Sequence, residues 1–508
     1  MKLDRLANSK RNIIWGLMGR IITTMLPFAL RTVIQITIGE EYLGLSGLFT
    51  SMLSMLNLAE LGLGSAMIYY MYKPFAEDNK KEICALLNLY KWLYRGIGGF
   101  ILIVGICISP FIGMFVKGSC PSDINLTILY FIYLIDTVLS YSLFSYRQSL
   151  LLVHQRNDLS YKIELLINIS LYAVQILLLF LFKNYYIFII VKPIFTVINN
   201  ILIFVITENV FPGYQSKGKV SKEKIVDIGK KVRALAGHKI GTTVVASADN
   251  IVISAFLGLS VVAKYGNYYT IMYAVISIMG MIMSSLMSGI GNGLVLNSKE
   301  DNYKLFNNIN FLIMWLVSWC SICFLCLYQP FMTIWMGKRM LLPFDSVILM
   351  VMYYYSWQCR VGVNLFKDAA GLWREDFWKP YVSAGVNIIA NICLVKLIGL
   401  NGVLISTIIA MVFINIPWET RVLMKHVFQR STGLYYLKQL WFLIRTCIAG
   451  VVTYFICGLF SLNGVFDFLV KGVICIVIPN IIIAILALKT EEFKYAKRMI
   501  LNIVGIKR

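Results

Sequence analysis

Long apolar blocks, each of about 18 or more residues and separated by short charged stretches, recur along the whole chain. A helix rises about 1.5 Å per residue, so each block is long enough to cross a hydrocarbon core of about 30 Å. The blocks lack the period-two alternation that marks a membrane-spanning strand. In lipid, a helix satisfies its own backbone hydrogen bonds, whereas an open strand cannot. The sequence therefore predicts an all-α, polytopic membrane protein.

The composition agrees with this prediction. Of the 508 residues, 59% are hydrophobic and only 14% are charged, whereas a soluble domain carries about 25% charged residues. We predict about fourteen transmembrane helices, which occupy the segments 12–38, 44–71, 84–115, 124–145, 163–182, 184–206, 234–257, 265–296, 305–328, 344–366, 380–397, 401–424, 439–460 and 466–488.

The net charge of +22 could indicate a nucleic-acid partner, but its distribution does not. If the amino terminus is cytoplasmic, the predicted inside segments hold 31 Lys and Arg residues and the outside segments hold five. This bias follows the positive-inside rule, and the anionic inner leaflet attracts such segments. We therefore expect a multi-pass protein of a bacterial cytoplasmic membrane, with both termini inside and no nucleic-acid partner. The basic amino terminus leads into a retained first span rather than a signal peptide.

Internal repetition divides the chain. Residues 20–47 align without gaps on residues 239–266 with eight identities, which include the pair Gly39 and Gly258. The offset equals six predicted spans, so both copies face the same way across the membrane, as in many transporters. We predict two six-helix lobes as parallel pseudo-repeats, a linker between them and two additional helices with a basic cytoplasmic tail, with the bounds 1–206, 207–233, 234–424 and 425–508.

The linker 207–233 is the largest predicted inside segment. Within it, Ser221 precedes a stripe of apolar residues that includes Ile225, Ile228 and Val232. This pattern predicts an amphipathic helix that lies on the membrane surface.

Ionisable side chains within spans are costly unless they face water, a partner or a substrate, and so they are candidate site residues. Arg20 lies about 12 Å from the inner end of the first span, and Lys239 has the equivalent position in the seventh. A cation on each lobe suits an anionic headgroup. The alternative is that both side chains snorkel or pack against a carbonyl. Arg31, on a similar helix face to Arg20, and Arg360, deep in the tenth span, are further candidates for substrate binding.

Acidic residues within spans are candidates for a coupling-ion site or for charge pairs. Asp249, in the seventh span, could pair with Arg31 or bind a cation. Glu60 in the second span and Asp136 in the fourth are similar candidates. Coupling to H⁺, Na⁺ or the membrane potential stays open at this point.

The sequence shows no constellation of an enzyme and no cofactor motif. It has no phosphate-binding glycine loop, no nucleophile elbow and no acidic pair in a substantial loop. Cys320, Cys323 and Cys326 recur at helical spacing inside an apolar span, so we interpret them as small buried residues rather than a metal site. We expect no metal and no catalytic residue.

Four stretches of the sequence resemble a known family. They are Gly39–Phe49 (GEEYLGLSGLF), Leu58–Gly64 (LAELGLG), Asp249–Gly258 (DNIVISAFLG) and Ala370–Asp376 (AGLWRED). In this order and spacing they are similar to bacterial polysaccharide repeat-unit flippases of the multidrug/oligosaccharidyl-lipid/polysaccharide exporter superfamily, and most similar to capsule and teichoic-acid-type members. The resemblance covers essentially the whole chain.

The resemblance implies two six-helix lobes and export of an undecaprenyl-diphosphate-linked oligosaccharide by alternating access. It also implies cavity cations on the first and seventh helices, at the positions of Arg20 and Lys239. The expected partners are thus a polyprenyl-diphosphate-linked saccharide and membrane lipid. The alternatives are a cation-coupled multidrug exporter of the same superfamily and a membrane polysaccharide polymerase or glycosyltransferase. The polymerase needs a large outside loop, which the short outside segments do not provide.

Overall fold

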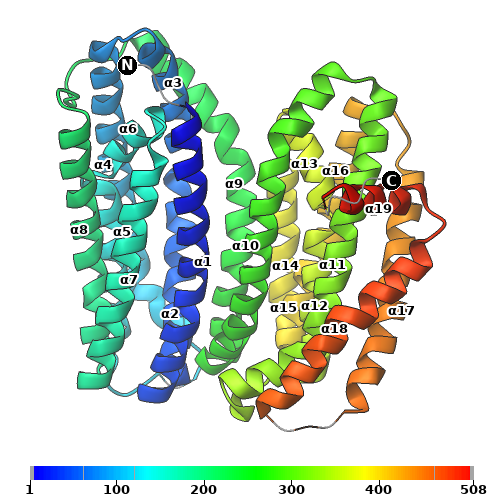
Figure 1. The fold of residues 1–508 in the computed structure, drawn as a ribbon. Coiled ribbons are helices and arrows are strands. Elements are labelled where there is room, and N and C mark those ends of the chain that lie inside the picture. The colour runs from blue at the N-terminus through cyan, green and yellow to red at the C-terminus, as the bar shows by residue number, and fades with distance from the viewer. Residues whose placement is uncertain (1–4, 61, 119, 461, 463, 504–508) are drawn as a thin grey trace. The chain divides into compact units, whose positions relative to one another are not determined.

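The computed structural model describes residues 5–60, 62–118, 120–460, 462 and 464–503. Every regular element in these ranges is a helix, so the predicted all-α fold is confirmed (Figure 1). The chain forms two compact units, Met1–Ala263 and Lys264–Arg508.

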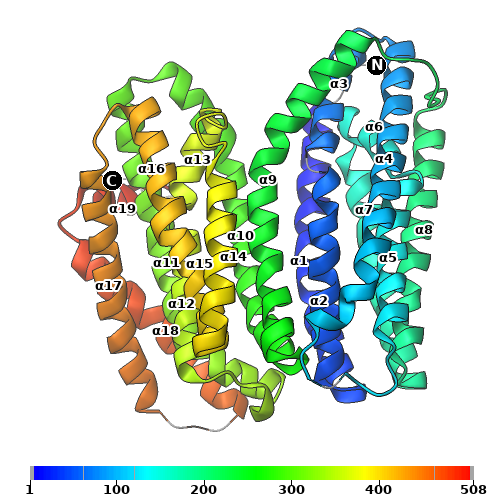
Figure 2. The same ribbon diagram turned by 180° about the vertical axis from the view of Figure 1, so that it is seen from behind.

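The first unit is built from long helices that pack in sequence-adjacent pairs, such as α1 with α2, α4 with α5 and α7 with α8 (Figure 2). Asparagine caps begin three of these helices. The side chain of Asn79 accepts a hydrogen bond from the backbone N–H three residues further on, and those of Asn125 and Asn184 accept from the N–H groups two and three residues further on. The helices are α1 (Arg5–Thr37), α2 (Glu40–Leu56), η1 (Asn57–Glu60), α3 (Leu63–Ala76), α4 (Lys80–Ile108), η2 (Ser109–Phe115), α5 (Leu126–Ser142), η3 (Ser145–Arg147), α6 (Gln148–Val153), α7 (Asn157–Phe182), α8 (Tyr185–Val210) and α9 (Lys222–Leu257).

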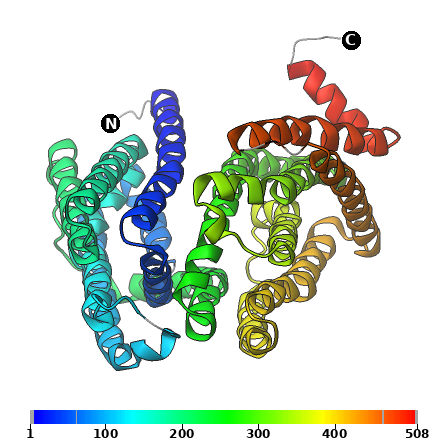
Figure 3. The ribbon, with the colours of Figure 1, turned by 90° about the horizontal axis from the view of Figure 1, so that it is seen from below.

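The second unit has the same kind of helical construction, and α10 enters it from the first (Figure 3). Its helices are α10 (Leu259–Leu296), α11 (Lys299–Trp335), η4 (Lys338–Met340), α12 (Phe344–Gln358), α13 (Val361–Ala369), α14 (Lys379–Ile398), α15 (Leu400–Ile409), η5 (Ala410–Asn415), α16 (Ile416–Leu423), η6 (Met424–Phe428), α17 (Gly433–Gly458), α18 (Gly464–Ala487) and α19 (Glu491–Ile503). The last two spanning helices, α17 and α18, pack on each other and on α11.

Among the described residues, ten helices are long and apolar enough to cross a membrane. An eleventh results if Leu126–Ser142 and Ser145–Val153, which meet at 45°, form one bent span. These helices define a multi-pass membrane protein. The count of about fourteen stays a prediction.

Breaks in the helix explain why two of the predicted spans are not among those ten. In the predicted span 44–71, α2 ends at Leu56, and Gly62 adopts a left-handed conformation (φ 84°) before α3 begins. In the predicted span 344–366, the chain breaks between α12 and α13. Glu60 lies at the first break and Arg360 at the second. In both cases, therefore, a charged residue lies where the helix is interrupted.

The repeated glycines of the sequence have matching backbone conformations. Gly39 joins α1 to α2 with φ 118° and ψ 173°, and Gly258 joins α9 to α10 with φ 93° and ψ 173°. Residues with a Cβ atom rarely adopt these positive φ angles, so glycine is required at both sites. Each glycine thus connects a long helix to its successor in the same way, which supports the alignment of 20–47 on 239–266.

The linker differs from its prediction. Ser221 does begin a helix, since its hydroxyl accepts a hydrogen bond from the backbone N–H of Lys224 at 3.4 Å. That helix, however, continues as α9 without interruption to Leu257. The segment from Lys222 to Leu257 contains no proline that would end the helix. The residues of the predicted amphipathic helix thus form the first turns of a 36-residue helix, and their place at the membrane surface stays a prediction.

Candidate functional site

The predicted cations of the first lobe lie on α1. The side chain of Arg20 is exposed. Arg31, eleven residues further along the same helix, is half-buried, and its guanidinium donates a hydrogen bond to the backbone carbonyl of Ala263 at 3.2 Å. The hydroxyls of Thr23 and Thr24 donate to helix carbonyls, including that of Arg20. These threonines therefore satisfy their polar groups within α1 and do not need a partner in lipid.

The matching cation of the second repeat lies in α9. Lys239 belongs to the helical backbone, but its side chain lies outside the described residues. Asp249, ten residues beyond it, is 1% exposed, so this carboxyl group is inside the packed unit rather than on its surface. The roles of Lys239 and Asp249 stay predictions.

Helices α2 and α9, which carry two of the stretches of the family resemblance, pack against each other, and α2 also contacts the start of α10. Asn250 donates a hydrogen bond to the hydroxyl of Ser51 at 2.9 Å, and Ser260 donates to Glu40 at 2.7 Å. Gly44 faces the backbone of Leu259 so closely that a Cβ atom there would lie 2.2 Å from the carbonyl oxygen. Gly44 therefore has a structural role, because it allows α2 to pack closely on the start of α10.

Glu60 accepts hydrogen bonds from two tyrosines. The hydroxyl of Tyr94 donates to Oε1 at 2.8 Å and that of Tyr141 to Oε2 at 3.3 Å. Tyr90 in turn donates to Tyr94 at 2.7 Å. The break after α2 thus places a carboxyl group against α4 and α5, where phenol hydroxyls donate hydrogen bonds to both of its oxygens.

Asp136 is paired. Its Oδ2 lies 3.0 Å from Nζ of Lys192, and its Oδ1 accepts a hydrogen bond from Thr196 at 2.6 Å. Lys192 and Thr196 both belong to α8, one turn apart. The pair therefore links α5 to α8 and satisfies the charge of each partner within the bundle.

Arg360 belongs to a buried charge network in the second unit. Its Nη1 lies 3.0 Å from Oε1 of Glu419, which is 1% exposed. Lys379 contacts the same oxygen, and Asn364 donates to Oε2 at 3.1 Å. Asp376 extends the network: Lys379 lies 2.9 Å from its Oδ2, and Lys367 contacts the same oxygen.

Of this network, only Arg360 was predicted from the sequence as a site residue. The remaining members are Lys367, Asp376, Lys379 and Glu419. Three cations thus surround two carboxylates at the inner end that the topology predicts for this lobe. Asp376 lies in the AGLWRED stretch of the family resemblance, which was the one sequence feature that pointed to this network. Its partner lysines, however, appeared in the sequence as ordinary loop charges.

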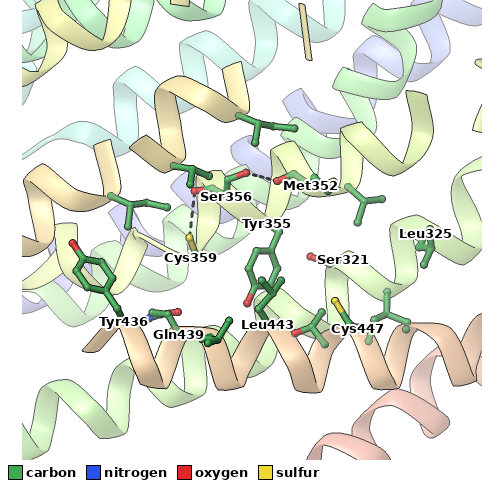
Figure 4. Close-up of a pocket in the computed structure, with 18 of the residues that line it drawn as sticks. Ser321, Leu325, Met352, Tyr355, Ser356, Cys359, Tyr436, Gln439, Leu443 and Cys447 are labelled. Carbon is green, nitrogen blue, oxygen red and sulfur yellow. Dashed lines mark hydrogen bonds between the residues drawn. The ribbon is translucent and has the colours of Figure 1, made fainter. Parts of the chain in front are cut away.

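An apolar pocket of about 510 Å³ lies between α11, α12, α17 and the α15–η5–α16 segment (Figure 4). Its lining extends along α17 from Tyr435 to Val451, a length of about 24 Å. Among the polar groups of this wall, the Ser321 and Tyr355 hydroxyls and the Gln439 amide make no hydrogen bond of normal geometry with a described residue. The pocket suits an apolar chain with a small polar group.

Comparison with known proteins identifies the family of this chain. The chain belongs to the polysaccharide biosynthesis protein family, whose model matches residues 9–287. The resemblance to polysaccharide flippases noted from the sequence is thus confirmed at the level of the family. No curated protein sequence matches the chain.

Solved structures share the fold. The lipid II flippase MurJ in its inward closed conformation aligns with a TM-score of 0.65 and 15% identity, over 94% of this chain and 98% of that chain. An inward-facing multidrug resistance MATE family transporter of the MOP superfamily aligns with a TM-score of 0.55 and 16% identity, over 79% and 96%. The Vibrio cholerae MATE transporter VcmN aligns with a TM-score of 0.55 and 12% identity, over 85% and 99%. At these identities the likeness concerns the fold.

Proposed function

We propose that this protein moves an undecaprenyl-diphosphate-linked oligosaccharide from the inner to the outer leaflet of the cytoplasmic membrane by alternating access, for the assembly of a cell-surface polysaccharide. The family match over residues 9–287 carries this proposal. The fold shared with a lipid II flippase supports it, because that relative's named substrate is also a lipid-linked molecule.

The chemistry of the substrate sets what the protein must provide. A diphosphate and a row of sugar hydroxyls cannot cross hydrocarbon alone, since each unpaired polar group costs several kcal/mol there. Arg20 and Lys239 are the proposed contacts to the diphosphate, and Arg31 and Arg360 are further candidates. An exposed arginine within an apolar helix, such as Arg20, supports this assignment because it can present two parallel donors to a phosphate.

The energy source in this proposal is the membrane potential. Outward movement of an anionic headgroup is favoured by an inside-negative potential, by about 2.3 kcal/mol per charge for each 100 mV. Coupling to H⁺ or Na⁺ is the alternative. The network around Glu419 argues against a cation site there, because three basic side chains already neutralise its two carboxylates. Glu60 and Asp249 are the remaining acidic candidates.

A cation-coupled drug exporter is the second candidate function, because the fold is also that of MATE transporters. Such an exporter needs an acidic cavity for cationic drugs, and the basic residues of α1 do not fit this requirement. A polymerase or glycosyltransferase is a third candidate, and the membership in a polysaccharide biosynthesis family leaves it to be tested directly.

The test is a reconstitution of the purified chain in liposomes without nucleotide. A fluorescent prenyl-diphosphate saccharide in the inner leaflet should become accessible to an external reagent, whereas a cationic dye should not be moved by a proton or sodium gradient. Dye movement without saccharide movement would support the drug exporter. Extension of the saccharide by the purified chain would support the polymerase.

A further inference from the structure

Three cysteines from different helices meet inside the second unit. Cys326 of α11, Cys457 of α17 and Cys475 of α18 have their sulfur atoms all within 4.8 Å of one another. Each is buried, with 6%, 3% and 0% of its surface exposed, and none forms a disulfide. The three cysteines of this cluster lie far apart in the sequence. The helical spacing of Cys320, Cys323 and Cys326 therefore did not predict the cluster.

The geometry fits a three-coordinate centre. A thiolate lies about 2.3 Å from a soft metal ion, so three thiolates around one centre lie about 4.0 Å from one another if the centre is planar and about 3.5 Å if it is pyramidal, as trivalent arsenic is. Three sulfur atoms within 4.8 Å therefore need a shift of less than about 1 Å to bind a common centre. Sulfur ligands favour soft, thiophilic ions over Mg²⁺ or Ca²⁺.

The surroundings determine the charge that such a centre can carry. The cysteines pack against Ile322, Ala449 and Ile483. The neighbouring lysine, Lys471, lies one turn before Cys475, and Asp467 already balances its charge at 2.7 Å. A tris-thiolate of Zn²⁺ would carry one negative charge and one of Cu⁺ would carry two, and an uncompensated charge is costly in this apolar site. A trivalent centre with three thiolates is neutral.

We propose that Cys326, Cys457 and Cys475 form a binding site for a trivalent thiophilic metalloid, such as arsenic(III) supplied as arsenous acid. The neutral acid has three hydroxyl groups on arsenic. Three arsenic–sulfur bonds form and three arsenic–oxygen bonds break, while each thiol proton leaves with a hydroxyl group as water. Arsenic stays trivalent, so no oxidant or reductant is needed.

Binding has a mechanical consequence within the second unit. The centre would connect α17 and α18 covalently to α11, three helices that otherwise associate through packing and a few hydrogen bonds, such as that from Trp319 to the carbonyl of Cys475 at 2.8 Å. The bound form should therefore be more stable than the free form, because the ligand binds the folded chain.

The experiment uses the full chain, purified in detergent with a thiol-free reductant and incubated with sodium arsenite. After removal of free arsenite, elemental analysis should give one arsenic atom per chain, and X-ray absorption at the arsenic edge should show three sulfur neighbours. Loss of a single second-shell contact lowers metal affinity by about 10–100-fold, so loss of a ligand in Cys326→Ser, Cys457→Ser or Cys475→Ser should lower it at least about tenfold.

Matched controls lie on the same helix. Cys320→Ser and Cys323→Ser remove thiols of α11 outside the cluster and should bind arsenic as the natural chain does. Arsenite should raise the melting temperature of the natural chain and of both controls but not that of Cys475→Ser. The proposal is overturned if the natural chain retains no arsenic, if arsenic has fewer than three sulfur neighbours, or if the three cluster variants retain as much arsenic as the controls.

Discussion

The guanidinium of Arg360 donates a hydrogen bond to Oε1 of Glu419 at 3.0 Å, and the two side chains are 11% and 1% exposed. Arg360 is the N-cap residue of α13, at the break after α12, and Glu419 lies on α16. Lys379, at the start of α14, contacts the same carboxylate. One carboxylate thus joins three segments of the second unit.

Replacement of Glu419 by glutamine should destabilise the second unit by about 3–5 kcal/mol, because it leaves buried cations without their anion. The measurement is thermal unfolding in detergent. Glu300→Gln is the control: it breaks an ion pair with Arg430 in which both partners are 40% or more exposed, and such pairs contribute about 0–1 kcal/mol. Equal melting temperatures for the two variants would show that the network does not support the unit.

Gly44→Ala should destabilise the first unit by about 1–3 kcal/mol, since the added Cβ atom overlaps backbone atoms that cannot move aside easily. The nearest is the carbonyl oxygen of Leu259, 2.2 Å from the Cβ position. Gly99→Ala is the matched control, because no atom lies within 4 Å of a Cβ there. Thermal unfolding and the protein level in membranes measure both. A Gly44→Ala chain as stable as Gly99→Ala would contradict the packing role of the motif glycine.

His154 should make stability fall at acidic pH. Its ring stacks on Phe211 at 3.9 Å between centroids, and its Nδ1 donates to the carbonyl of Leu150 at 2.8 Å. Burial lowers the pKa of His154 below its usual 6.5, aided by Lys80 and opposed by the bond to Leu150. The unfolded chain therefore binds a proton that the folded chain does not, so this contribution is full above about pH 6.5 and is lost as the pH falls below it.

The measurement is the melting temperature between about pH 7.5 and pH 5.5, in the natural chain and in His154→Phe. Phenylalanine keeps an aromatic ring against Phe211 but cannot titrate. The natural chain should lose more stability over this interval than the variant. Parallel pH profiles would exclude His154 as the source of the dependence.

The topology is tested by cysteine labelling in a chain whose natural cysteines are replaced. Lys338→Cys should react with a membrane-impermeant maleimide added outside, and Lys222→Cys should react only after the membrane is permeabilised. Both side chains are exposed in the structure, so access depends on the side of the membrane. External labelling at residue 222 would contradict the charge-based orientation.

The sequence predicted the all-α membrane fold because apolar length alone determines which segments can span. It also predicted the repeat, whose glycines Gly39 and Gly258 have matching conformations. It missed the partners of Arg360, because Glu419 lies 59 residues away and a contact between distant helices leaves no periodic signal. The cluster of Cys326, Cys457 and Cys475 was missed for the same reason. The amphipathic pattern of the linker is compatible with both a short helix and the first turns of a longer one, so it did not predict that α9 continues to Leu257.

The binding of the substrate diphosphate by Arg20 and Lys239 is the core of the proposed function. It is tested most directly in liposomes, where flipping of a prenyl-diphosphate saccharide is compared between the natural chain and the Arg20→Ala, Lys239→Ala double variant at equal protein density. Arg20→Lys should restore part of the rate and Lys239→Arg most of it, since arginine offers a two-pronged donor and lysine a point charge. The double variant should insert normally, but liposomes that contain it should flip the saccharide no faster than protein-free liposomes. Flipping at the natural rate by the double variant would contradict it.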